Sequence, residues 1–333
     1  MVRFNFNNFN PFSSYFTSAG STPTNKAETT TTEQKDHEHV EHKHQEEQPD
    51  QVEDGDNLSG PGEEQGELIT LRYPTEGYPK LDIVAVHGLD GHHLDSWTHN
   101  PQSPDATMWL RDLLPAKLPG ARIMTFSYDA SVIGNTSAHG IRANSEKLVN
   151  LLRNERDDIE DKDRPIVFIG HSLGGIIIKQ AIRKVEHDKE KGPDMADIAK
   201  SIKGMVFFGT PHRGADSAKW LALLSSIAAA ATNKPKSEFA TTLQTNSEDL
   251  MKISEDFRPI AHKYAVASFY EEHAHRLLGT VVVEKTSAVM GLNHEESMML
   301  GGTHSSMCKF KRGDRRFDPV WRAIRRASKG RGV

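Results

Sequence analysis

The chain has 333 residues, of which 36% are hydrophobic and 26% are charged, and Cys308 is its single cysteine. One cysteine excludes an internal disulfide, and the lack of any apolar run of about 18 residues argues against a membrane-spanning helix. The formal net charge of −5 hides an asymmetry, because residues 28–67 carry −12 and residues 309–333 carry +8.

Residues 1–67 are predicted to form a disordered, low-complexity tail. Between Glu28 and Glu67, fourteen Asp and Glu stand against two Lys, with three aliphatic side chains. This composition buries too little apolar surface to offset the chain entropy lost on folding. Histidines at positions 37, 39, 42 and 44 are interpreted as part of this solvated tail, so we expect no metal and no cofactor. The first 27 residues are interpreted as ordinary disorder, with an organelle transit peptide as the alternative.

Residues 68–327 suit one α/β domain of about 250 residues, followed by a basic tail at 328–333. Short apolar runs alternate with helical patterns, which is typical of a parallel sheet flanked by helices. The predicted strands are 81–86, 122–128, 165–169, 204–208, 264–270, 280–283 and 297–300. The predicted helices are 108–114, closed by Pro115, then 141–153, 174–185 and a basic final helix. Residues 215–257 are rich in Ala and Leu and fit a helical cap over a site.

A Gly-His-Ser-Leu-Gly motif at 170–174 stands between a predicted buried strand and an apolar helix. A strand, a sharp turn and a helix are the context in which such a serine acts as a nucleophile. The turn strains the serine backbone and brings neighbouring chain so close that Gly170 and Gly174 must lack side chains. We therefore predict Ser172 as the nucleophile.

A serine hydroxyl needs a base within hydrogen-bond reach. His304 follows the last predicted strand, in a Gly-Gly-Thr-His-Ser sequence whose glycines let the loop turn inward. His294 is the nearest competitor, but it precedes that strand in a polar turn. We predict His304 as the base.

A carboxylate should orient the histidine and should lie between serine and histidine along the chain. Glu271 ends one predicted strand, Glu284 ends another, and Asp216 follows the strand that ends near Gly209. We rank Glu271 first, Glu284 second and Asp216 third, with Glu272 as a further alternative.

Acyl transfer develops negative charge on the carbonyl oxygen, which backbone amides can stabilise. The amide of Leu173, directly after the nucleophile, is the first predicted donor. The second is predicted to be the amide of Leu89, in the glycine-containing loop 87–91 that follows the first core strand.

Taken together, these motifs resemble a known group, the lipase-like α/β hydrolases of the serine-active-site-containing protein family, whose domains also stand at the front of NACHT and ankyrin-repeat proteins. The resemblance covers about residues 68–324 and is carried by segments 86–91, 126–128, 170–175, 207–214, 268–271, 287–288 and 304–310. It implies an α/β-hydrolase fold with a mostly parallel sheet, and a Ser-acid-His esterase or lipase in which Glu271 is the acid. Thr286 stands where some members have an acidic residue, which weakens the region of Glu284. No NACHT or repeat region follows Val333, so we expect a stand-alone enzyme.

The leading functional hypothesis is hydrolysis or transfer of an acyl group from an ester substrate, with a lipid ester favoured, through an acyl-Ser172 intermediate. The alternative is a catalytically silent hydrolase fold that serves as a signalling or scaffolding module. The basic segment 309–333 is predicted to contact anionic membrane lipids peripherally. No nucleic-acid partner is expected. We expect an intracellular location, either cytoplasmic or associated with mitochondrial or endoplasmic reticulum membranes.

Overall fold

The computed structural model describes residues 66–74, 77–131, 137–157, 162–214, 216–244 and 247–331. Apart from Gly66 and Glu67, the predicted acidic tail and its histidine cluster lie outside these residues. The description below concerns the part of the chain that begins at Gly66.

A seven-stranded sheet forms the centre of this part, in the order β1-β5-β2-β6-β7-β8-β9. Its first strand, β1, runs antiparallel to β5 at one edge, and all other neighbours pair in parallel. The strands are β1 Glu67–Arg72, β2 Leu81–Val86, β5 Ala121–Ser127, β6 Ile166–His171, β7 Ile202–Phe208, β8 Ala265–Glu271 and β9 Glu296–Leu300. A small separate pair joins β3 Thr98–His99 to β4 Thr107–Met108.

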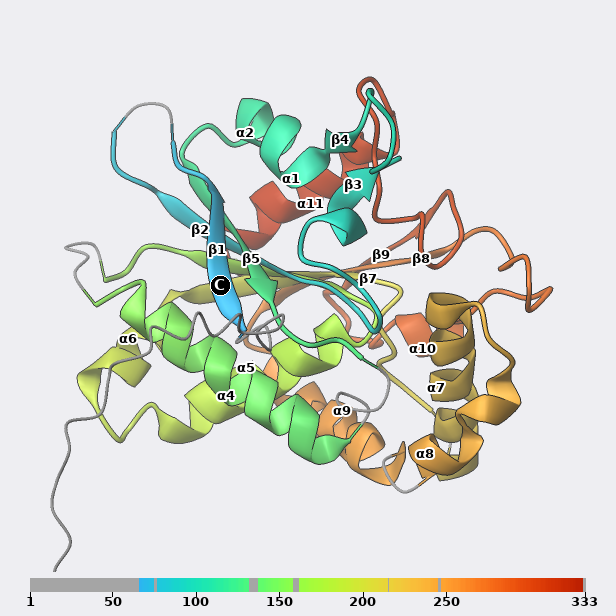
Figure 1. Ribbon diagram of the computed structural model, residues 1–333. Helices are drawn as coiled ribbons and strands as arrows, with labels where there is room; N and C mark the ends of the chain where they lie inside the picture. The colour runs from blue at the N-terminus through green and yellow to red at the C-terminus, as the bar shows by residue number, and fades with distance from the viewer. Residues whose placement is uncertain are drawn as a thin grey trace, which may run out of the picture. The chain divides into compact units, whose positions relative to one another are not determined.

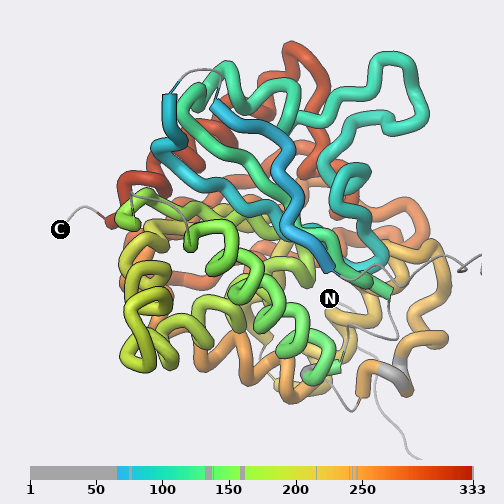
Figure 2. Tube along the Cα trace, turned by 60° about the vertical axis from the view of Figure 1, so that its left-hand side comes forward, coloured from blue at the N-terminus to red at the C-terminus, as the bar shows by residue number. Residues whose placement is uncertain are grey.

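The helices cover both faces of the sheet, with α4, α5, α6 and α9 on one face and α1, α2 and α11 on the other (Figure 1). They are α1 Trp109–Asp112, α2 Leu114–Lys117, α4 Ala138–Asn154, α5 Gly174–Asp188, α6 Pro193–Ser201, α7 Ser217–Thr232, α8 Ala240–Gln244, α9 Ser247–Ala261, α10 Lys285–Ala288 and α11 Phe317–Ala327. Two 3₁₀ turns, η1 Asp95–Trp97 and η2 Lys236–Glu238, complete the set. Figure 2 shows β1 beside β5 at the sheet edge, with α4 running along the lower face.

The side chains of β2 show that helices cover both faces of the sheet. All six side chains of β2 are buried, since this strand lies between β5 and β6 in the middle of the sheet. Successive side chains of a strand point to opposite faces. Val84 and Val86 accordingly join the core under α4 and α5, whereas Ile83 and Ala85 join the core under α1 and α11. The predicted α/β-hydrolase architecture, a mostly parallel sheet between helical layers, is confirmed.

Several predicted elements differ from the structure. Residues 280–283 form a loop and not a strand, because their backbone amides turn toward β8 instead of pairing in the sheet. Pro115 does not end a helix at 114 but lies in the first turn of α2, where its missing amide hydrogen needs no partner. Strand β1 and helix α6 were not predicted from the sequence.

A buried ion cluster lies at the start of β2, at the sheet end opposite to the strand ends that carry Ser172 and Glu271. The carboxylate of Asp82, which is fully buried, contacts the guanidinium groups of Arg122 at 2.9 Å, Arg156 at 2.6 Å and Arg164 at 3.2 Å. A buried charge is tolerated only where opposite charges and hydrogen bonds replace water. This cluster therefore joins the starts of β2 and β5 to the end of α4 and to the segment before β6.

Candidate active site

Ser172 occupies the turn between β6, which ends at His171, and α5, which begins at Gly174. Its φ of +53° lies in the left-handed region that non-glycine residues rarely adopt. The strain is held by a hydrogen bond from the Ser172 amide to the carbonyl of Phe208 at 2.9 Å, and Gly174 packs directly on the backbone of β2. The predicted sharp turn is thus present, and it directs the Ser172 hydroxyl above the carboxyl ends of the strands.

His304 lies in the loop after β9 and places its imidazole beside Ser172. Its Nε2 is 2.9 Å from the Ser172 hydroxyl, and its Nδ1 is 2.7 Å from Oε1 of Glu271. A carboxylate only accepts hydrogen bonds, so Nδ1 carries the proton and Nε2 is free to accept from the hydroxyl. The side chains of His304 and Glu271 are almost completely shielded from solvent.

Glu271 is the last residue of β8 and is fixed by main-chain donors. The amide of Val282 donates to Oε2 and the amide of Val283 donates to Oε1, both at 2.8 Å. Burial by itself raises the pKa of this carboxyl, but the electrostatic interaction and hydrogen bond with His304 and the two main-chain hydrogen bonds more than offset it and lower the pKa below its usual value. Glu271 therefore stays ionised beside His304 at neutral pH.

The other candidate carboxylates lie elsewhere. Glu284 is exposed at the start of α10 and lines a different hollow, together with Thr280 and Thr286. Asp216 caps α7 by accepting a hydrogen bond from the amide of Lys219 at 2.8 Å. Glu272 is also exposed. Of the four predicted carboxylates, the structure brings Glu271 to His304 and leaves Glu284, Asp216 and Glu272 apart from it.

The loop after β2 runs against the nucleophile. A β-carbon built on Gly88 would lie 2.8 Å from the β-carbon of Ser172, so only glycine allows this approach. Leu89, the next residue, lines the pocket beside Ser172, and Leu173 begins the turn into α5. Within the part of the chain that the structure describes, neither the Leu89 nor the Leu173 amide donates a hydrogen bond. Both predicted donors thus keep a free amide.

His87, which directly follows β2, is buried and neutral. Burial lowers its pKa to about 4, and its ring stacks on Tyr128 with 4.3 Å between the ring centroids. The Tyr128 hydroxyl donates to the His87 carbonyl at 2.7 Å. Tyr128 thus holds the chain just ahead of Gly88 and Leu89. This role of Tyr128 was not predicted from the sequence. The Phe-Ser-Tyr sequence at 126–128, where β5 ends, is the local feature that could have indicated it.

His171, the residue before the nucleophile, also serves the site. Its Nε2 donates to the backbone carbonyl of His304 at 2.9 Å. Burial, followed by the nearby charge of His304, lowers the pKa of His171 to about 3, so it remains neutral. The first x position of the Gly-x-Ser-x-Gly motif thus fixes the loop that carries His304, a contact that was not predicted.

Lys179, in the first half of α5, is fully buried. Its ammonium group donates to the carbonyl of Pro211 at 2.8 Å and to the hydroxyl of Ser254 at 3.1 Å. Burial lowers the pKa of Lys179 well below its usual value, although Glu295 opposes this shift. Lys179 joins α5 to the loop after β7 and to α9.

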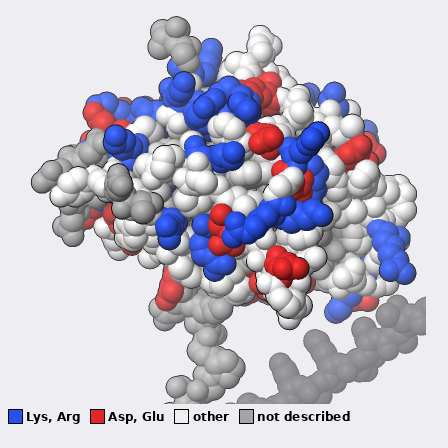
Figure 3. Space-filling view, turned by 90° about the horizontal axis from the view of Figure 1, so that it is seen from above, with Lys and Arg blue, Asp and Glu red and all other residues white. Residues whose placement is uncertain are grey.

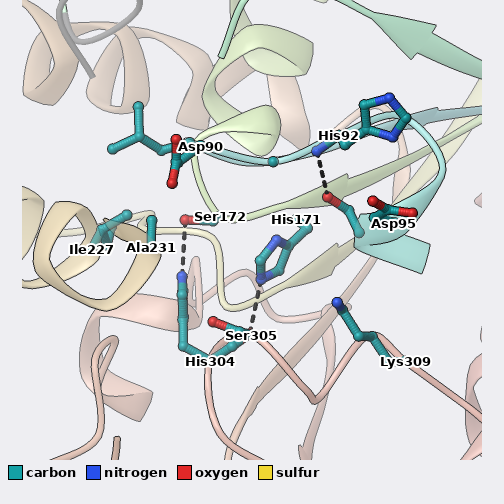
Figure 4. Close-up of a pocket in the computed structure, with 13 residues that line it drawn as sticks. Asp90, His92, Asp95, His171, Ser172, Ile227, Ala231, His304, Ser305 and Lys309 are labelled. Carbon is teal, nitrogen blue, oxygen red and sulfur yellow. Dashed lines mark hydrogen bonds between the residues drawn. The ribbon is translucent and has the colours of Figure 1, made fainter. Parts of the chain in front are cut away.

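A pocket of about 270 Å³ opens beside Ser172 (Figure 4). Its lining comes from the loop after β2, from η1, from α7 and from the segment around His304. On one side lie Ile227 and Ala231 of α7, and on the other lie Asp95 and Lys309, with Ser172 and His304 between them. A ligand placed here lies beside both the Ser172 hydroxyl and the His304 imidazole.

Among the residues that the structure describes, no group of three or more His, Cys, Asp and Glu is placed to hold a metal ion. None of the helices that the structure describes is both long and apolar enough to cross a bilayer.

Comparison with solved structures gives α/β hydrolases at low identity. A carboxylesterase structure from Nitrososphaera gargenis has 11% sequence identity and a TM-score of 0.44, and covers 82% of this chain and 98% of that chain. A soluble variant of monoglyceride lipase from Saccharomyces cerevisiae has 13% identity and a TM-score of 0.43, and covers 76% of this chain and 88% of that chain.

Comparison with curated sequences gives the protein SERAC1. The Bos taurus protein is 24% identical over 268 residues, and the Homo sapiens protein is 23% identical over 268 residues. Each match covers 74% of this chain, but the chain spans only 39% of the length of these relatives. The resemblance predicted from the motifs is confirmed. Residues 80–265, more than half of the chain, match the family described as "Putative serine esterase (DUF676)", and the chain belongs to this family.

Proposed function

We propose that this protein is a serine esterase that cleaves lipid esters through an acyl-Ser172 intermediate. The observation that carries the proposal is the unbroken hydrogen-bonded series from Glu271 through His304 to Ser172, which ends in an open pocket. This arrangement lets a serine hydroxyl act as a nucleophile at neutral pH.

In the first half-reaction, Nε2 of His304 takes the Ser172 proton while the Ser172 oxygen attacks the ester carbonyl. The negative charge that forms on the carbonyl oxygen is stabilised by the amides of Leu89 and Leu173. Glu271 stabilises the imidazolium and keeps its orientation. The carbon–oxygen bond to the alcohol then breaks, and the alcohol leaves with the proton of His304.

In the second half-reaction, water replaces the alcohol. His304 takes a proton from this water, whose oxygen attacks the acyl carbonyl and forms a second oxyanion at the same amides. The bond to Ser172 breaks, the acid leaves, and the proton returns to the Ser172 oxygen.

The lipid character of the substrate is supported by α7. Ile227 and Ala231 give the pocket one apolar side, next to Ser172 and His304 (Figure 4). An acyl chain that lies along this side removes apolar surface from water, worth about 25 cal/mol per Å².

The decisive experiment is labelling with a fluorophosphonate probe, followed by hydrolysis of p-nitrophenyl esters of increasing acyl length. The wild type should be labelled and Ser172→Ala should not, whereas Ser297→Ala, a change at an exposed serine of β9, should be labelled like the wild type. A folded wild type that is neither labelled nor active on any ester would instead indicate the alternative class, a catalytically silent scaffold.

We further propose that the enzyme meets its substrate at anionic bilayers through a basic face. Figure 3 views the side of the molecule on which α2 and α11 lie, and Lys and Arg side chains gather there. Lys117, Arg322 and Arg325 are exposed and surround Trp321, with cation-to-ring distances of 4.5 to 5.4 Å. Anionic lipids attract such a cluster by about 1 kcal/mol per basic residue.

Co-sedimentation with vesicles tests this contact. Binding should rise with the phosphatidylglycerol content of phosphatidylcholine vesicles and fall with added salt. Arg322→Ser combined with Arg325→Ser should weaken it, whereas Arg153→Ser on α4, an exposed arginine of the opposite face, should not. Binding that is insensitive to lipid charge and salt contradicts the proposal.

A further inference from the structure

Three charged side chains line the pocket beside Ser172 without a partner of their own. They are Asp90, Asp95 and Lys309. Among the described residues, the carboxylates of Asp90 and Asp95 and the ammonium group of Lys309 make no ion pair and no side-chain hydrogen bond. Asp90 has a φ of +50°, and its amide is fixed by the carbonyl of Ala130 at 2.7 Å, so the backbone that carries this carboxylate is well defined.

These charges are not needed by the catalytic series. His304 is already paired with Glu271, and the ring of His171 is occupied by the His304 carbonyl. Unpaired charges that converge on one cavity are the groups that fix and select a ligand. Their partner is therefore to be sought in the substrate.

The positions of the charges divide the pocket into two ends. In Figure 4, Ile227 and Ala231 lie on one side of Ser172, while Asp95 and Lys309 lie on the other. Asp95 comes from η1 and Lys309 from the segment that follows His304, so the two charges approach the pocket from different elements. An ester whose acyl chain lies along α7 places its alcohol part between Asp95 and Lys309.

We infer that the alcohol part of the substrate is zwitterionic, with its anionic group at Lys309 and its cationic group at Asp95. This inference rests on the proposed esterase function. A purely anionic alcohol part would pair with Lys309 but would be repelled by the carboxylate of Asp95. A purely cationic one would leave Lys309 unpaired and repelled. A zwitterionic alcohol part places a cationic group at Asp95 and an anionic group at Lys309, so both side chains gain a partner of opposite charge.

Four octanoyl esters test the inference, because they share the acyl chain and differ in the charge of the alcohol part. They are 1-octanoyl-glycerophosphocholine (zwitterionic), octanoylcholine (cationic), 1-octanoylglycerol 3-phosphate (anionic) and 1-octanoylglycerol (neutral). For the wild type, kcat/KM should be highest for the zwitterionic ester and lowest for the anionic one. Lys309→Gln should lower the ratio of zwitterionic to neutral kcat/KM about tenfold and raise the ratio of cationic to neutral. Asp95→Asn should lower both ratios and raise the ratio of anionic to neutral.

Charged residues that do not line the pocket provide the matched controls. Lys311→Gln and Asp105→Asn remove exposed charges that do not line it and should leave every ratio at the wild-type value. Equal ratios in the wild type, Lys309→Gln and Asp95→Asn, with normal fluorophosphonate labelling and hydrolysis of the neutral ester, would overturn the inference and leave the esterase proposal standing. An unlabelled wild type that cleaves none of the four esters would defeat the esterase proposal itself, and the inference with it.

Discussion

Gly209, the residue that follows β7, lies directly against the imidazole of His304. A β-carbon built on Gly209 would be 3.0 Å from both Cε1 and Nδ1 of the ring. The φ of Gly209 is +53°, and its amide donates to the carbonyl of Phe269 at 2.9 Å. The backbone of Gly209 thus supports the face of the base, and any side chain there must displace the ring.

Gly209→Ala should therefore lower kcat/KM at least tenfold through displacement of His304. Gly279→Ala is the matched control, because Gly279 also has a positive φ, +67°, but no neighbour within 4 Å of an added β-carbon. Both changes should destabilise the fold by ~1 kcal/mol through backbone strain. Ester kinetics and chemical denaturation separate the two effects. An equal loss of activity in both variants would show that strain and not contact with His304 is responsible.

Glu271→Gln should lower kcat about 10³-fold or more, since loss of the buried carboxylate in other triads costs up to about 10⁴. The uncharged amide stabilises the imidazolium less, and its NH2 group, when turned toward Nδ1, donates to it and favours the wrong tautomer. Glu284→Gln, which changes an exposed carboxylate, should stay within about twofold of the wild type. Kinetics of the two variants with one p-nitrophenyl ester decide between the carboxylates. A larger loss in Glu284→Gln would reverse the assignment.

Asp82→Ala should destabilise the fold by ~3 to 5 kcal/mol, because it leaves three buried guanidinium groups without their shared carboxylate. The specific activity of the folded fraction should not change, as the cluster lies at the other end of β2. Asp163→Ala removes an ion pair with Lys200 whose two side chains are 63% and 66% exposed, so water and salt screen it and its loss should cost far less than the loss of Asp82. Urea unfolding monitored by circular dichroism measures both. Similar losses would mean that the buried cluster contributes little.

Stability should decrease as the pH falls below 6.5. The pKa of His87 is lowered to about 4 and that of His171 to about 3 in the folded chain, from 6.5 in the unfolded chain. The unfolded chain therefore binds more protons in this window, and the stability present above pH 6.5 is lost as the pH falls toward these folded values. Each group contributes a slope of at most ~1.4 kcal/mol per pH unit.

Replacing one of these histidines tests the slope. His87→Phe keeps an aromatic ring against Tyr128 but cannot take up a proton, so the free energy of unfolding should fall less steeply between pH 6.5 and 4. His92→Asn changes an exposed ring and should leave the slope unchanged. An identical pH profile for His87→Phe and the wild type would mean that His87 titrates normally.

The sequence predicted the central strands well, because those covered on both faces contain continuous apolar runs, such as 83–86 and 166–169. It missed β1, whose side chains are half-buried or exposed and which follows directly on an acidic stretch. It also gave no reason to bury Lys179, since its partners Pro211 and Ser254 come from segments 32 and 75 residues away. Partners that distant leave no local pattern.

In the candidate site, too, the residues with a local sequence pattern could be predicted, and those that depend on distant contacts could not. Ser172 could be placed because its motif and the flanking strand and helix are contiguous, and His304 because it follows the last strand. The choice among carboxylates stayed open, because it depends on the path of residues 280–283 in space. Their apolar character resembles a strand, whereas their amides in fact bind Glu271.

The two hydrogen bonds that anchor the Glu271 carboxylate come from the main-chain amides of Val282 and Val283. Every amino acid except proline has such an amide, so the anchoring does not depend on which side chains stand at these positions. Which side chains are tolerated at these two positions therefore depends on how well they pack, because the side chains themselves do not bind the carboxylate. Glu271 thus keeps both main-chain donors through most single substitutions at 282 and 283, whereas proline at either position removes one of them and should lower the proposed esterase activity while leaving Ser172, His304 and Glu271 unchanged.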